Sequence, residues 1–258
     1  AVLNNQITNG RNGISTDGDI LEIVKSFLVS NNHFGKLEKG INIELSRRNS
    51  SFKNMIIAGN KIEESYYNSV VAELDEATDA VISDFNIIDN VIRDGEIKID
   101  TYGATGNSVI EVSIIGNQMT DIDNAAITIS SDKTMLAEIR DNIVSSSSYG
   151  DYHINIQGGS LTETLVEGNY FSNALFKSIA VSGRNNHTVM ADIQNNQFTL
   201  SGSIATGIDL SSGLQGQMVA KISSNDLLNK DGGASSISIF GGNSKGFIKS
   251  EVVNNRLS

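Results

Sequence analysis

An asparagine that recurs about every 27 residues is the feature that most constrains the fold of this chain. Each copy lies in a short motif: an aliphatic residue, two other residues, Asn, any residue and an apolar residue. Ten copies at so narrow a spacing indicate a repeat architecture in which each unit stacks on its neighbours. The repeated asparagines, separated by 25 to 30 residues, are Asn5, Asn32, Asn60, Asn90, Asn117, Asn142, Asn169, Asn196, Asn225 and Asn255.

Runs of alternating apolar and polar residues fill the intervals between these asparagines. One run begins 7 to 12 residues after an asparagine, as in Ile127-Thr128-Ile129, and another leads into the next asparagine, as at 109–114. Alternation with period two is typical of strands with one buried face, and the abundant Ile, Val and Thr favour strands. The sequence predicts an all-β fold, a single-stranded right-handed parallel β-helix solenoid of about ten coils of about 27 residues, with three strands per coil.

The residue before each asparagine predicts a sharp corner. It is Gly, Asn, Asp or Ser, and most of these residue types tolerate the positive φ that such a corner requires. The amide of the following asparagine then points inward, where its donors and acceptor must be satisfied. We expect the asparagines to stack as a ladder along the axis, and Phe171 and Phe198 to stack in the core on adjacent coils.

The repeat resembles the parallel β-helix repeats of the pectate-lyase-like superfamily over essentially the whole chain. That resemblance implies that the Ile-x-Ile strand after each asparagine corner lines a substrate groove. The cysteine-free, acidic chain, rich in Asn, Gly, Ser and Thr, looks most like the passenger of a bacterial autotransporter or adhesin. We expect residues 1–258 to form a single domain that is a fragment of a longer chain.

A leucine-rich repeat is the rival fold, because residues 112–119 also fit its pattern. Leucine-rich repeats use mostly Leu and place a helix or 3₁₀ turn opposite the strand. Here the opposite segments alternate with period two, which favours the β-helix.

The composition of the chain limits the classes of partner and the cellular location that we expect. A net charge of −11 argues against a nucleic-acid partner, and the absence of Cys excludes disulfides and zinc–thiolate sites. No apolar run reaches transmembrane length, so we expect no membrane insertion by this segment. We expect an extracellular or bacterial cell-surface location.

The outward residues of the Ile-x-Ile strands form two rows along the axis. In the second row Glu44, Glu73 and Asp100 fall on three consecutive coils, about 5 Å apart, where their charges repel. A Ca²⁺ ion bound by these three carboxylates is one way to compensate them, and Lys98 is another. The turn arginines that follow Glu44 are a third way, and they are Arg47 and Arg48.

Tyrosines near these rows suggest a sugar site. We expect Tyr66, Tyr67 and Tyr102 to lie in loops beside the carboxylates, where aromatic faces stack on sugar rings. The predicted ligand-binding residues are Glu44, Glu73, Lys98, Asp100, Tyr66, Tyr67, Tyr102, Asn155 and Asp209.

Two functions remain open at this point. The first is an adhesin-like protein that binds polysaccharide, glycosaminoglycan or extracellular matrix protein along its long face. The alternative is a polysaccharide lyase or glycoside hydrolase, including a phage tailspike, with Glu44, Glu73, Asp100 and Lys98 in catalysis. We expect no cofactor other than the possible Ca²⁺.

Overall fold

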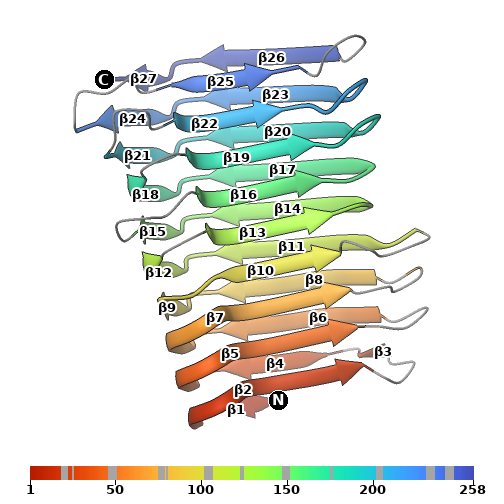
Figure 1. The fold of residues 1–258 in the computed structure, drawn as a ribbon, viewed down its shortest axis with the longest axis vertical. Coiled ribbons are helices and arrows are strands. Elements are labelled where there is room, and N and C mark those ends of the chain that lie inside the picture. Colours follow the sequence, from red (N-terminus) through yellow and green to blue (C-terminus); the bar gives the residue numbers. More distant parts are fainter. Residues whose placement is uncertain are drawn as a thin grey trace.

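The computed structural model is a right-handed parallel solenoid. In Figure 1 the near strands point right, the far strands point left, and the stack climbs from the N-terminus to the C-terminus. All regular structure among the described residues is β-strand, which confirms the predicted fold class and shows the leucine-rich alternative to be wrong. The structure describes residues 1–18, 23–24, 26–45, 51–74, 79, 81–101, 107–122, 125–146, 152–174, 177–201, 206–230, 236–241 and 247–258.

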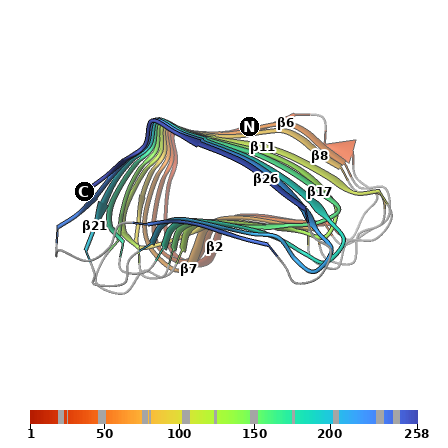
Figure 2. The same ribbon diagram turned by 90° about the horizontal axis from the view of Figure 1, so that it is seen from above.

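Each coil contributes to three walls, which we number in the order that the chain meets them after a ladder asparagine. Figure 2 shows these walls along the axis. Wall 1 holds β9 (Val91–Arg93), β12 (Gln118–Ile122), β15 (Ile143–Ser146), β18 (Tyr170–Ala174), β21 (Gln197–Leu200), β24 (Asp226–Asn229) and β27 (Arg256–Leu257). Wall 2 holds β10 (Ile97–Thr101), β13 (Ala125–Ser131), β16 (Tyr152–Gly158), β19 (Lys177–Gly183), β22 (Thr206–Ser211) and β25 (Ile237–Phe240).

Wall 3 leads into the next asparagine and forms a sheet of its own. It holds β1 (Val2–Leu3), β3 (Ile23–Val24), β4 (Phe27–Ser30), β6 (Ser51–Ala58), β8 (Val81–Ile88), β11 (Val109–Ile115), β14 (Thr134–Arg140), β17 (Leu161–Glu167), β20 (Thr188–Gln194), β23 (Gln217–Ser223) and β26 (Phe247–Val253). Each of these strands pairs in parallel with those one coil away, as β14 does with β17.

The first coils are built differently from the later ones. There walls 1 and 2 are one continuous strand, namely β2 (Gln6–Gly18), β5 (His33–Leu45) and β7 (Lys61–Leu74). From Asn90 onward the strand splits, and β7 pairs with both β9 and β10. Three strands per coil is therefore confirmed for the later coils only. The solenoid has about eight turns, slightly fewer than the expected ten.

The asparagine ladder is present along the whole stack. The Oδ1 atom of Asn90 accepts from the backbone N–H of Asn60 at 2.9 Å and from its Nδ2 at 3.0 Å. The Nδ2 atom of Asn90 in turn donates to Oδ1 of Asn117 at 3.0 Å and to the Ile57 carbonyl at 2.9 Å. The same contacts link Asn5 to Asn32 and continue to Asn255.

The corner before each ladder asparagine has the predicted backbone. Every one of the ten preceding residues has φ between 53° and 68°. They are Asn4, Asn31, Gly59, Asp89, Gly116, Asp141, Gly168, Asn195, Ser224 and Asn254. The left-handed conformation turns the chain sharply, which directs the next amide inward.

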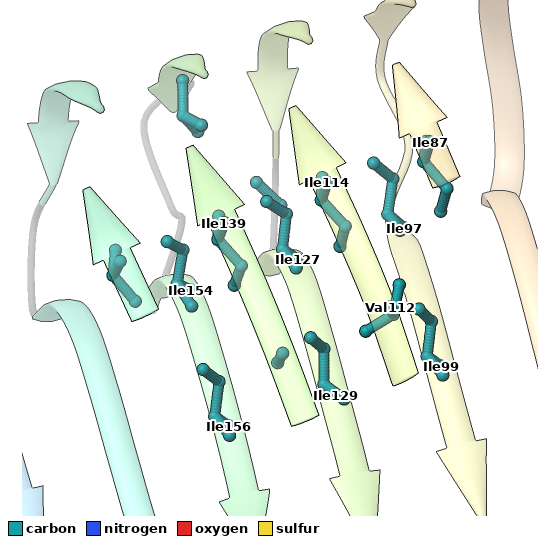
Figure 3. Packing of buried hydrophobic residues seen from close by; sticks show 14 of the residues in the cluster. Ile87, Ile97, Ile99, Val112, Ile114, Ile127, Ile129, Ile139, Ile154 and Ile156 are labelled. Atoms are coloured by element: carbon teal, nitrogen blue, oxygen red, sulfur yellow. The ribbon is translucent and has the colours of Figure 1, made fainter. Parts of the chain in front are cut away.

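Inward side chains of walls 2 and 3 meet in a continuous apolar core. Figure 3 shows the wall 2 isoleucines facing wall 3, among them Ile97, Ile99, Ile127, Ile129, Ile154 and Ile156, opposite Ile87, Val112, Ile114 and Ile139. Toward wall 1, the rings of Phe171 and Phe198 stack with centroids 5.1 Å apart, as predicted. The ring of His153 extends this stack, 5.3 Å from Phe171 and fully buried.

Candidate functional site

The outward residues of wall 2 form the two rows that the sequence indicates. The register aligns Glu44 with Glu73, and Glu73 with Asp100. Backbone pairing continues the first row as Asn42, Val71, Lys98, Thr128, Asn155, Ala180, Asp209 and Ser238. It continues the second row from Asp100 as Ser130, Gln157, Ser182, Ser211 and Phe240. The outer face of wall 2 is thus mostly polar along the axis, and its apolar positions are Val71, Ala180 and Phe240.

Lys98 forms ion pairs with two of the stacked carboxylates. Its Nζ atom lies 2.7 Å from Oε1 of Glu73 and 3.4 Å from Oδ2 of Asp100. Burial lowers the pKa of Lys98, but the hydrogen bond and charge of Glu73, with help from Asp100, outweigh it and raise the pKa. Lys98 is therefore held protonated. Arg47 and Arg48 lie outside the described residues.

Glu44 has partners from its own strand. Asn42 Nδ2 donates to Oε1 of Glu44 at 2.7 Å, and Lys39 Nζ donates to the same oxygen at 3.2 Å. The Asn42 hydrogen bond, then Lys39, lowers the pKa of the Glu44 carboxyl despite its partial burial. One coil beyond Lys98, Ser130 Oγ donates to Oδ1 of Asp100 at 2.7 Å. The carboxylates are thus held in a fixed hydrogen-bonded arrangement.

A second charged cluster lies further along wall 2. Lys177 forms an ion pair with Asp209, and its Nζ atom lies 5.9 Å from the centroid of the Tyr152 ring. The hydrogen bond with Asp209 raises the pKa of Lys177. The sequence predicted Asp209 and Asn155 as ligand-binding residues and placed Tyr152 in a turn beside the groove, but it missed Lys177. Aligning the strand starts would have found Lys177, because Tyr152 and Lys177 are partners in register.

Glu96 is a further carboxyl that the sequence reasoning missed. It lies just before β10, and burial raises its pKa against a hydrogen bond with Thr128 and the charge of Lys98. Glu96 lies outside the Ile-x-Ile pattern, and only the surrounding coils create its burial. A partly buried carboxyl with a raised pKa therefore lies near carboxylates that are ion-paired with Lys98.

The tyrosines only partly match the expectation. Tyr66 and Tyr67 lie inside β7 rather than in a loop, because the first coils run from wall 1 to wall 2 without a break. Their side chains are outside the described part of the structure, and so is the whole of Tyr102. Among the described residues, wall 2 carries the aromatic rings of Tyr152, beside Lys177, and of the exposed Phe240 at the end of the second row.

The acidic row does not form an obvious metal site among the described residues. Nowhere in the described ranges do three or more His, Cys, Asp or Glu side chains gather as a metal site would need. Lys98 occupies the position between Glu73 and Asp100 that the sequence left open to Ca²⁺.

Comparison with protein-family models, with curated proteins and with solved structures finds no match. The described residues contain no helix that could cross a membrane. The fold and the arrangement of side chains on wall 2 are therefore the basis for a functional assignment.

Proposed function

We propose that this protein is a secreted or cell-surface β-helix that binds a linear polysaccharide along the outer face of wall 2. The observation that carries the proposal is the in-register polar strip, in which donors and acceptors recur at each coil. Coils about 4.8 Å apart repeat at a distance comparable with one sugar residue of an extended chain. A regular polymer can therefore make similar contacts at successive coils.

The side chains of this face suit sugar hydroxyl groups. Carboxylates, amides, hydroxyls and ammonium groups alternate, and they already hold one another in position, as Lys98 does between Glu73 and Asp100. Groups ordered in advance lose less entropy on binding than free side chains do. Tyr152, beside Lys177, offers an aromatic face for a sugar ring.

Charge narrows the class of polysaccharide. The net charge is −11, and three carboxylates stack at one end of the strip, which disfavours sulfated glycosaminoglycans. A neutral or amino-sugar polymer fits this face best. Its natural source would be a cell surface or an extracellular matrix, consistent with an extracellular location for this chain.

A second candidate function is glycoside hydrolysis, and Glu96 favours it. Hydrolysis needs one protonated carboxyl and one ionised carboxylate. Burial raises the pKa of Glu96, whereas Glu73 and Asp100 are paired with Lys98. A lyase is less well supported, because Lys98 is held protonated and is a poor base.

The test is retention on immobilised neutral, amino-sugar and sulfated polysaccharides, with and without Ca²⁺. We expect retention on one of the first two, weakened about tenfold by Lys98→Gln or Asp209→Asn through lost charge-assisted hydrogen bonds. Lys53→Gln, an exposed change on wall 3, serves as the matched control. If the protein is retained and none of the wall 2 variants changes that retention, the proposal is wrong.

Product analysis separates binding from catalysis. Under the binding function, no new reducing ends or unsaturated sugars appear during prolonged incubation. If reducing ends appear and Glu96→Gln abolishes them while binding persists, the protein is a hydrolase.

A further inference from the structure

The outer face of wall 3 carries a groove that the sequence did not indicate. It is an open cavity of about 680 Å³ that runs along the axis across β11, β14, β17, β20, β23 and β26. It lies on a different wall from the polar strip of wall 2. A volume of this size is within the range of ligand-binding clefts.

The groove lies where the inward side chains of wall 3 become smaller. The central inward position of this wall is Met55 in β6 and Phe85 in β8, and these two are in register. From Val112 onward the same position carries smaller residues, namely Ala137, Thr164, Ala191, Ala220 and Ser250. Small side chains let the wall approach the core, so its outer surface recedes. In Figure 2 the strands β6 and β8 extend further out than β17 and β26.

The floor of the groove is aliphatic. Four outward residues on consecutive coils line the groove: Leu136, Leu165, Met190 and Val219. The outward residues of wall 3 also form two rows along the axis. Leu136, Met190 and Val219 lie in one row, and Leu165 lies in the neighbouring row. Val219 is 39% exposed. The stripe is about 15 Å long from coil spacing, and it is staggered because Glu163 lies between Leu136 and Met190 in register. Apolar side chains gathered on an outer strand face mark a contact site.

The groove is also acidic, and one of its carboxylates has no partner among the described residues. Its lining contains Glu111, Glu138, Glu163, Asp192 and Glu251 against Lys221 and Lys249, five acids and two lysines. The Oδ1 atom of Asp192 is buried and accepts no hydrogen bond from the described residues. Asp192 forms no ion pair with the described residues, although Lys221 is its partner in register. The residue as a whole is only partly buried, so a cationic group of a ligand can approach the carboxylate from the groove.

We propose that this groove binds an extended peptide segment with aliphatic side chains along one face and a basic residue that reaches Asp192. The aliphatic side chains would cover the stripe from Leu136 to Val219. The wall 3 strands from β11 to β23 already pair on both sides, so the peptide contacts side chains and does not add a strand. The described lining has no aromatic ring on which a sugar could stack. This site is independent of the function proposed for wall 2.

The test is fluorescence anisotropy with three labelled peptides of equal length. One alternates leucine and lysine, the second leucine and glutamate, and the third serine and lysine. We expect the first to bind at least about tenfold more tightly than the others, since it alone matches both the stripe and the charge. Equal binding of the serine–lysine peptide would reduce the groove to a nonspecific acidic surface and overturn the proposal.

Variants locate the binding. Leu165→Gln and Asp192→Asn should each weaken the leucine–lysine peptide about tenfold, while thermal unfolding stays close to that of the parent protein. Ile143→Gln makes the same kind of change at an exposed apolar position on wall 1 and should leave the affinity unchanged. An affinity that both groove variants leave intact rejects the site.

A second copy of the chain is the main competing occupant. Light scattering across a concentration series distinguishes it. A dimer that Leu165→Gln dissociates would assign the stripe to self-association and overturn the peptide proposal, whereas a monomer at all concentrations supports it.

Discussion

Oδ1 of Asn117 accepts two hydrogen bonds from Asn90, one from the backbone N–H at 3.0 Å and one from the side-chain Nδ2 at 3.0 Å. Both residues are buried, and Asn117 repeats the arrangement with Asn142 on the next coil. The ladder therefore satisfies polar groups at a corner that water does not reach.

Removal of one ladder amide should be strongly destabilising. Asn117→Ala leaves the buried Asn90 backbone N–H without an acceptor and takes one of its acceptors from Asn90 Nδ2, which keeps the Ile57 and Ile88 carbonyls. The Ile87 carbonyl also loses the donor Asn117 Nδ2, and we expect the free energy of unfolding to fall by about 3 kcal/mol. Urea denaturation measures the loss. Asn86→Ala, which removes an exposed hydrogen bond, should cost under about 0.5 kcal/mol. Similar losses in the two variants would contradict the structural role of the ladder.

The stability cost of a substitution at a corner should depend on which side chain is introduced. Gly116 has φ of 68°, where a β-branched residue is strained, so Gly116→Val should cost about 2 kcal/mol or more. Gly116→Asn should cost less, since Asn31 and Asn195 adopt the same conformation at equivalent corners. Thermal unfolding of both variants checks the order, and an equal cost would argue against a conformational cause.

His153 should make stability depend on pH. Burial lowers its pKa from 6.5 to about 4, with a smaller opposing effect from the Ser172 backbone. The unfolded chain binds the proton first, so this contribution is complete above pH 6.5 and is lost as the pH falls toward 4. The loss should approach about 3 kcal/mol.

A comparison of variants isolates this effect from the carboxylates that titrate in the same range. His153→Phe, which keeps a ring beside Phe171, should flatten the stability profile between pH 6.5 and 4. His33→Gln, at a partly exposed histidine paired with Glu63, should leave that part of the profile in place. Parallel profiles for the parent protein and His153→Phe would show that His153 is not the titrating group.

In the acidic row, Lys98 should supply the positive charge that a bound metal ion would otherwise supply. Lys98→Gln leaves Glu73 and Asp100 facing each other without a cation, so we expect a loss of about 1 kcal/mol that added salt reduces. We further expect Ca²⁺ to raise the Tm of this variant more than that of the parent protein. Lys53→Gln controls for net charge. A parent protein that Ca²⁺ stabilises to the same degree would speak against this role.

The repeat in the sequence was enough to predict the coil. Spacing placed each ladder asparagine above the last, and period-two runs identified which residues of wall 2 point outward, from Asn42 to Ser238. The stacking of Phe171 on Phe198 followed from their equal distance to successive asparagines. These predictions succeed because stacking in a solenoid is a local rule, in which each residue meets its equivalent one coil away.

The tertiary structure alone decided what the side chains do across coils and between walls. Lys98 pairs with Glu73 and Asp100, and Lys177 pairs with Asp209. Glu96 is partly buried only because neighbouring coils cover it, and this burial raises its pKa. The groove over Ala137 and Ala191 depends on the volume of a whole inward column rather than on any one motif. Periodicity in a sequence determines direction and register, whereas the distance between side-chain atoms and the depth of a wall depend on how the coils pack together.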